Sequence, residues 1–225
     1  MNITHEHPEY KKLRIGLGDA KNNGCWYYSI EIVNNIMPNV ETKREWNTVG
    51  RELTGMKDGM IVFLHDNATP WHYDWLKKYK DLVLVCSSQY TADSVKYSGK
   101  TIVLPMSIDT EYVKQFRVPE KTEDTCFVGN RWVQQNLREI PTRVRLGKVD
   151  YISGVEREEM LEKVALYRNA YAIDRCAQEV QVLGCKLLPL NIGYGCDSTD
   201  VLDNRDAAKI LQEQLDLIDK GGKNV

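Results

Sequence analysis

Glu179 is the residue of this chain whose surroundings most clearly suggest binding chemistry. It lies five residues before Gly184, and an apolar segment at 186–190 follows the glycine. This spacing predicts a helix that carries the carboxylate and ends at the glycine, followed by a strand. Helices that start after strands hold nucleotides in α/β proteins, and an ionised carboxylate can accept hydrogen bonds from both hydroxyls of a ribose. The alternative is an ordinary surface glutamate on an amphipathic helix.

A second group of candidates has the chemistry that a diphosphate requires. Gly129 and Asn130 follow an apolar segment and would allow close backbone approach to phosphates. Arg131 comes next and could neutralise the diphosphate bidentately as it leaves. Arg175 and Lys186 are further candidates, and for all three cations the alternative is a solvated surface charge.

His65 and Asp66 directly follow the apolar segment Met60–Leu64. The histidine could bind a sugar hydroxyl or a phosphate, and the aspartate could orient it or the acceptor. We therefore predict these two residues as catalytic, without naming a general base. The alternative is a core histidine with a helix-capping aspartate.

The composition excludes several classes of function. The chain has 225 residues, 42% of them hydrophobic, and a net charge of −2, which argues against a strongly basic nucleic-acid surface. The six cysteines form no C-x-x-C pair and do not combine with the four histidines at zinc-ligand spacing. We expect reduced, mostly buried cysteines, no metal and no cofactor. The absence of an apolar leader or a membrane-length segment favours a cytoplasmic protein.

The elements that would position these residues alternate between strands and helices. The first half contains apolar strands and amphipathic helices, predicted at 13–17, 27–37, 60–64, 69–79, 82–86, 88–97 and 101–104. A polar segment at 117–124 is typical of a linker. The second half continues with segments predicted at 125–128, 153–169, 170–173, 178–183, 186–190 and 207–218, of which the 153–169 helix opens with a Ser153–Glu156 capping box. Strands this apolar are usually covered on both faces, as in parallel sheets.

This order predicts an α/β protein of two Rossmann-like halves that face a cleft. We expect an N-terminal half at 1–116, a C-terminal half at 123–203, and a C-terminal helix and tail at 204–225.

Several of these segments resemble the GT-B glycosyltransferases, in particular the retaining family 4-like branch. The resemblance covers about Leu13 to Leu190, and its order and spacing are more specific than any single piece. It is carried by His65-Asp66 at a strand end, by segments similar to the family's "V-x-P-x-G-V-D" and "F-V-G" motifs at 101–109 and 126–130, and by a final segment at 155–190. A compact chain of this kind resembles the GT-B glycosyltransferases that phages encode.

The resemblance implies a transferase that moves a sugar from a nucleotide-diphosphate sugar to an acceptor, with retention. The half at 1–116 would then bind the acceptor and the half at 123–203 the donor, whose ribose Glu179 would bind. The acceptor would be a glycan, a small molecule, a protein or a modified DNA base.

Two departures from the family leave a second interpretation open. Tyr171 stands where the family carries its first glutamate, eight residues before Glu179, and the donor half is short. The alternative is therefore a catalytically degenerate GT-B-like module that binds a nucleotide or a partner without turnover. A third interpretation is a flavodoxin-like or other Rossmann-like enzyme.

Overall fold

The computed structural model describes residues 12–16, 43–45, 58–64, 70–129, 149–189 and 200–219. The chain divides into two compact units, one formed by residues 1–106 and 204–225 and the other by residues 107–203. The second unit is thus inserted into the first between Met106 and Asn204. The segment predicted as a linker, 117–124, lies inside the second unit, and the C-terminal helix belongs to the first.

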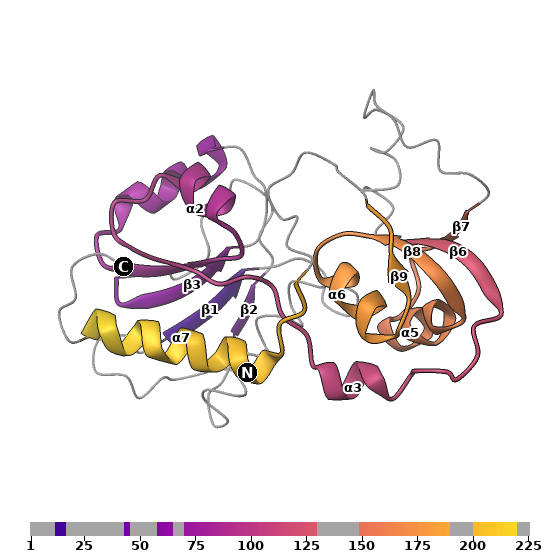
Figure 1. The fold of residues 1–225 in the computed structure, drawn as a ribbon. Helices are drawn as coiled ribbons and strands as arrows, with labels where there is room; N and C mark the ends of the chain where they lie inside the picture. The colour runs from indigo at the N-terminus through magenta and orange to yellow at the C-terminus, as the bar shows by residue number, and fades with distance from the viewer. Residues whose placement is uncertain are drawn as a thin grey trace. The chain divides into compact units, whose positions relative to one another are not determined.

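The first unit is built on a five-stranded sheet in which every described strand pair is parallel. The strand order is β2-β1-β3-β4-β5 (Figure 1). The strands are β1 (Lys12–Gly16), β2 (Lys43–Glu45), β3 (Met60–Leu64), β4 (Leu82–Cys86) and β5 (Lys100–Val103). The apolar segments predicted as buried strands at 60–64 and 82–86 are β3 and β4, and all ten of their residues are buried.

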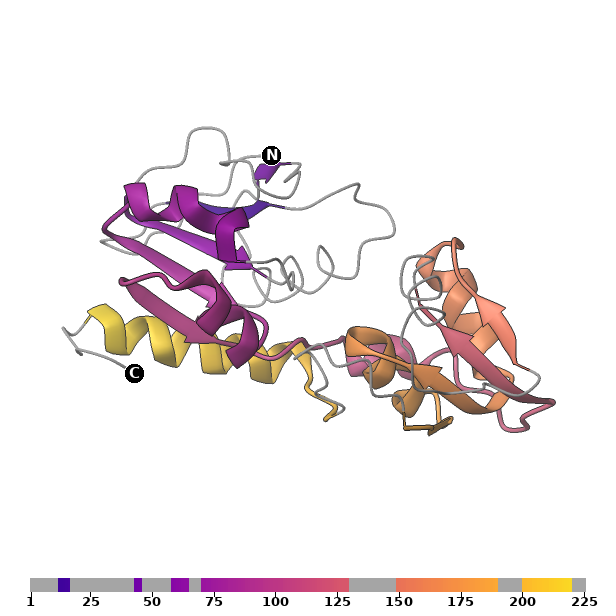
Figure 2. The ribbon, with the colours of Figure 1, turned by 90° about the horizontal axis from the view of Figure 1, so that it is seen from above.

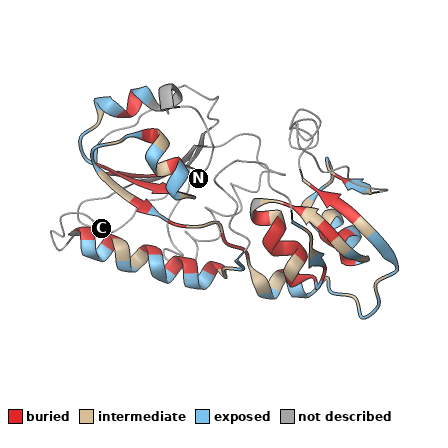
Figure 3. Cartoon of the chain, turned by 45° about the horizontal axis from the view of Figure 1, so that its top comes forward, coloured by how far each residue is buried: buried red, intermediate tan, exposed pale blue. Residues whose placement is uncertain are grey.

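Three described helices belong to the first unit. They are the 3₁₀ helix η1 (Pro70–Lys78) and the α-helices α2 (Gln89–Val95) and α7 (Asn204–Asp219). The α7 helix runs alongside the sheet and contacts β5 (Figure 2). The face predicted from its 3.6-residue period is buried, as Ala207, Leu211, Leu215 and Ile218 show (Figure 3).

The second unit is built on a four-stranded parallel sheet with the order β7-β6-β8-β9. The strands are β6 (Glu123–Val128), β7 (Asp150–Ile152), β8 (Tyr167–Ala172) and β9 (Lys186–Leu187). In both sheets the first strand lies between the second and the third. This order confirms the predicted parallel α/β architecture, which is compatible with Rossmann-like units.

Helices α5 (Arg157–Ala165) and α6 (Asp174–Val182) contact each other, and the short helix α3 (Thr110–Lys114) packs against α6. Small side chains on the sheet, Ala170 and Ala172, share one core with Leu161 and Val164 of α5 and with Val180 of α6. Because α3, α5, β8 and β9 all contact α6, this helix is the central helix of the second unit.

Two local predictions in this unit are wrong. The N-cap of α5 is Glu156, whose side chain makes no capping hydrogen bond, so Ser153 and Glu156 do not form a capping box. Gly154 has a φ of +70°, and the turn that it makes delays the start of the helix. The helix also ends at Ala165, and Tyr167, predicted as its inward-facing residue, begins β8 instead.

The predicted end of α6 is confirmed. Gly184 has a φ of +80°, and its N–H donates to the Gln181 carbonyl at 2.9 Å, while the Cys185 N–H donates to the Val180 carbonyl at 3.0 Å. These two bonds form a Schellman motif, which requires a left-handed residue at Gly184. The helix begins at Asp174, four residues before the predicted start, and this brings Arg175 into its first turn.

Candidate functional site

The candidate site lies at the edge of the second sheet where its parallel strands end. Val128, Ile152 and Ala172 are neighbours in register at the carboxyl ends of β6, β7 and β8. The chain leaves β6 toward β7 on one side and later returns to β8 on the other. The carboxyl ends of β6 and β8 therefore form a topological switch point, the place where open α/β sheets bind ligands.

Two arginines start the helices that follow these strands. Arg157 is the first residue of α5, five residues after β7 ends, and Arg175 is the second residue of α6, three residues after β8 ends. Since both helices run back along a parallel sheet, their N-termini lie at its carboxyl edge. The sheet topology thus places both arginines beside the switch point.

Glu179 joins the two arginines. The Nε of Arg157 donates a hydrogen bond to Oε1 of Glu179 at 3.1 Å, and the Nε of Arg175 lies 3.3 Å from the same oxygen. The side chains of Arg157, Arg175 and Glu179 are 12%, 5% and 3% exposed. A carboxylate this deeply buried requires compensating charge, so the alternative of a solvated surface glutamate is excluded. We call these three side chains the arginine–glutamate cluster.

Helix α3 contacts the cluster from a third direction. The guanidinium carbon of Arg157 lies 5.3 Å from the centre of the Tyr112 ring, within the range of a cation–π interaction. The Tyr112 hydroxyl donates to Glu158 at 2.9 Å. Arg157 is therefore held both by a carboxylate and by an aromatic ring.

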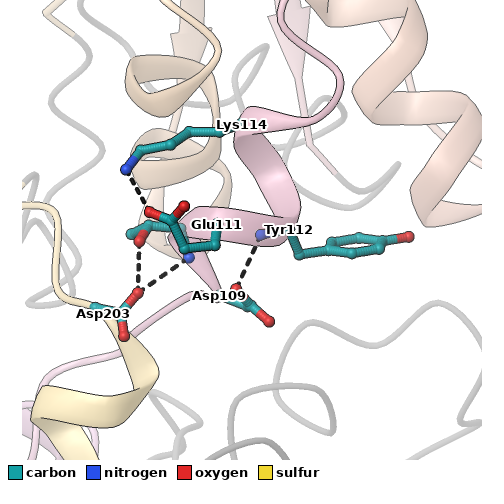
Figure 4. Close-up of polar contacts among 6 residues, drawn as sticks. Asp109, Glu111, Tyr112, Lys114 and Asp203 are labelled. Carbon is teal, nitrogen blue, oxygen red and sulfur yellow. Dashed lines mark hydrogen bonds and ion pairs between the residues drawn. The ribbon is translucent and has the colours of Figure 1, made fainter.

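The position of Tyr112 is itself fixed by two aspartates at the start of α3. Asp109 caps the helix by accepting the Tyr112 N–H at 2.9 Å, and Asp203 accepts the Thr110 N–H at 3.2 Å (Figure 4). A β-bridge joins Ile108 to Asp203 next to these contacts. On α6, the buried Gln178 accepts the Leu202 N–H at 3.0 Å. Residues 202 and 203, which contact the start of α3 and the helix that carries Glu179, thus connect the two helices.

The structure brings some of the predicted site residues together and separates one. Arg175 and Glu179 meet in the cluster, and Gly129 directly follows β6, where its N–H donates to the Ile152 carbonyl at 3.3 Å. Lys186 is exposed and pairs with Asn169, three residues before the end of β8, so it lies away from the carboxyl edge. The predicted residues His65, Asp66, Asn130 and Arg131 lie outside the described residues.

Arg157 was not predicted from the sequence, although a signal for it exists. The positive end of the helix dipole disfavours a cation in the first turn, and Arg157 stands there beside Glu158 and Glu159. The wrong capping box hid this signal, because it started the helix at Ser153 and placed Arg157 in its second turn.

Comparison of the chain with protein-family models, with curated proteins and with solved structures found no match in any of the three. None of the helices in the described part of the chain is long and apolar enough to cross a membrane. Within the same ranges, no three histidine, cysteine, aspartate or glutamate side chains gather as metal ligands. The glycosyltransferase resemblance therefore remains a prediction from the sequence.

Proposed function

We propose that this protein is a glycosyltransferase that binds a nucleotide-diphosphate sugar through its second unit and transfers the sugar to an acceptor. The observation that carries the proposal is the arginine–glutamate cluster at the carboxyl edge of the second sheet. It places two guanidinium groups beside two helix N-termini at a topological switch point of the sheet.

The charges of the cluster favour an anionic ligand. Two guanidinium groups face one carboxylate, so the three side chains together carry one net positive charge. The N-termini of α5 and α6 add positive potential to the same edge, and this potential favours a bound anion. A diphosphate carries the opposite charge and would fit this edge of the sheet.

The predicted acceptor side belongs to the first unit. Its sheet also has a switch point, between β1 and β3, and His65 directly follows β3 in the chain. A glycosyltransferase of the predicted kind would hold the acceptor on this half and the donor on the other. That arrangement, the catalytic roles of His65 and Asp66, and retention are part of the proposal.

The second candidate is a module that binds the nucleotide sugar without turnover. Tyr171, at the position of the family's first glutamate, is a residue of β8 opposite Phe127 rather than a residue of a helix. Glu179, the other expected glutamate, is 2% exposed. Neither position thus offers an exposed carboxylate for catalysis, which favours binding without turnover.

A two-step experiment tests the proposal and separates the two candidates. Thermal-shift screening against UDP, GDP and ADP sugars should reveal one class that raises the melting temperature under either candidate. Incubation of that sugar with an acceptor library should then release the free nucleoside diphosphate if the protein is a transferase. Stabilisation without release would favour the binding module, and the absence of any stabilising nucleotide sugar would contradict both.

A further inference from the structure

We propose that Glu179 is a positioning residue that holds Arg157 and Arg175 for the donor diphosphate and does not itself bind the ribose. This inference rests on the proposed function, because it assigns roles within the same site. The sequence predicts that Glu179 contacts the ribose. In the role proposed here, Arg157 and Arg175 contact the diphosphate, and Glu179 acts only through them.

The first argument is the geometry of a single oxygen atom. Oε1 of Glu179 lies 3.1 Å from the Nε of Arg157 and 3.3 Å from the Nε of Arg175. The arginines come from different helices, whereas Arg175 and Glu179 are one turn apart on α6. One carboxylate oxygen therefore contacts guanidinium groups from two helices and fixes the distance between them.

The second argument is the order of exposure. The side chain of Glu179 is 3% exposed, that of Arg175 is 5% and that of Arg157 is 12%. The carboxylate is therefore the least exposed member of the cluster, and Arg157 is the most exposed. A ribose diol would have to displace an ion pair to reach Oε1, whereas a phosphate approaching the cluster would meet a guanidinium.

The third argument is that the arginine nearest to solvent is held on two sides. Tyr112 lies against the guanidinium of Arg157 at 5.3 Å, and Glu179 accepts its Nε–H. A guanidinium held in this way loses little freedom when it binds a phosphate. The carboxylate and the ring thus act as supports for a group that makes the ligand contact.

A thermodynamic cycle distinguishes positioning from ribose binding. Isothermal titration calorimetry would measure the affinities of the nucleoside diphosphate that binds best, of its 2′-deoxy form and of inorganic pyrophosphate. The measurements would be made on the wild-type protein and on Glu179→Gln. If Glu179 positions the arginines, the variant binds pyrophosphate roughly tenfold or more weakly, while the ratio of ribose to deoxyribose affinities stays the same.

Two results would overturn the inference. The carboxylate would bind the ribose if, in Glu179→Gln, the ratio of ribose to deoxyribose affinities fell to one while the affinity for pyrophosphate stayed unchanged. An unchanged affinity for all three ligands would show that Glu179 has a structural role alone. If the wild-type protein bound pyrophosphate but no nucleotide, the proposed function would fail while the pyrophosphate comparison still tested the positioning role.

A second variant keeps the test valid if Glu179→Gln does not fold. Arg157→Lys keeps the charge and removes the planar fork from the most exposed position of the cluster. We expect it to weaken pyrophosphate binding and to leave the ratio of ribose to deoxyribose affinities unchanged. Arg168→Lys, at an exposed position of β8, is the matched control and should change neither value.

Discussion

At the scale of single residues, Glu179 shows how burial changes the meaning of a sequence pattern. The spacing to Gly184 correctly predicts where the helix ends, but it does not reveal that α6 is enclosed by α3, α5, β8 and β9. That enclosure depends on contacts between segments far apart in the chain, which a local pattern does not contain. The sequence pattern suggests a solvated or ligand-binding carboxylate, whereas in the structure Glu179 is paired with two arginines.

The buried hydroxyl of Ser87 gives a prediction about stability. Ser87 follows β4, the residue is 7% exposed, and its buried hydroxyl has no hydrogen-bond partner among the residues that the structure describes. We expect Ser87→Ala to raise the free energy of unfolding by about 1 kcal/mol, because the hydroxyl is desolvated without compensation. Urea denaturation followed by circular dichroism measures the change.

The neighbouring serine is the matched control for that substitution. Ser88 is the N-cap of α2, and its hydroxyl accepts the Thr91 N–H at 3.1 Å. Ser88→Ala should therefore lower the free energy of unfolding by about 1 kcal/mol. Equal losses in the two variants would mean that the Ser87 hydroxyl has a partner in the folded protein.

The cysteines give a second residue-scale prediction. Burial raises the pKa of the Cys86 and Cys126 thiols from 9.0 to about 12 and also raises that of Cys185. Because the thiolate is the reactive form, these three should be labelled by a maleimide at pH 8 far more slowly than the partly exposed Cys176. Mass spectrometry of the labelled peptides measures the order of the labelling rates. Equal labelling of Cys86 and Cys176 would contradict the prediction.

The same pKa shifts predict how stability depends on pH. An unfolded thiol ionises near pH 9, whereas the folded Cys86 and Cys126 thiols keep their protons up to about pH 12. The folded state therefore binds more protons in this range, and the stabilising contribution falls as pH rises from 9 toward 12. Urea denaturation at pH 8 and pH 10 should show lower stability at pH 10. A rise in stability over this range would contradict the sign.

At the scale of secondary structure, continuous apolar segments were the most predictable. The bounds of β3 and β4 follow directly from two runs of five apolar residues, and α7 follows from its 3.6-residue period. The start of α5 was missed because Gly154 makes a turn within an apparent capping box, and β7 was missed because Asp150 and Tyr151 are exposed. Short or exposed elements take their structure from sheet pairing, which no local pattern records.

Lys121 contacts the C-terminal ends of two helices and should stabilise both. Its Nζ donates to the Ala165 carbonyl at 2.6 Å and to the Leu183 carbonyl at 2.8 Å, at the C-termini of α5 and α6. A cation there satisfies unpaired carbonyls and interacts favourably with both helix dipoles. Lys121→Met should lower the free energy of unfolding by about 2 kcal/mol in urea denaturation.

Lys163→Met is the control for that loss. Lys163 forms an exposed ion pair with Glu159 on α5, with a side chain that is 51% exposed. Such pairs contribute roughly 0.5 kcal/mol or less. If the two lysine variants were equally stable, Lys121 would not hold the helix ends as the structure indicates.

At the scale of the whole molecule, the second unit is an insertion with a core of its own, whereas the first unit needs the C-terminal helix. Leu211 and Leu215 of α7 are 1% and 0% exposed, and α7 contacts β5 of the first unit. The shared strand order of the two sheets fits two α/β halves of one kind. From the sequence we expect the last helix in a separate tail, because the strand that it contacts, β5, lies about a hundred residues earlier in the chain.

Truncation after Asp203 tests this division. Removal of α7 should expose the buried apolar residues of the first unit and leave the core of the second unit intact. Limited proteolysis with mass spectrometry should then show rapid cleavage within 60–104 and protection of 150–187. Equal protection of both regions in the truncated chain would mean that α7 is not needed by the first unit.

The most direct test of the central claim is calorimetric titration of UDP, GDP and ADP into three proteins. These are the wild type, the double variant Arg157→Gln/Arg175→Gln, and the control Arg168→Gln, whose arginine is exposed on β8. We predict that one nucleotide binds the wild type and the control equally, and binds the double variant roughly a hundredfold or more weakly. Equal binding to all three proteins, or no binding to the folded wild type, would contradict a donor site at the arginine–glutamate cluster.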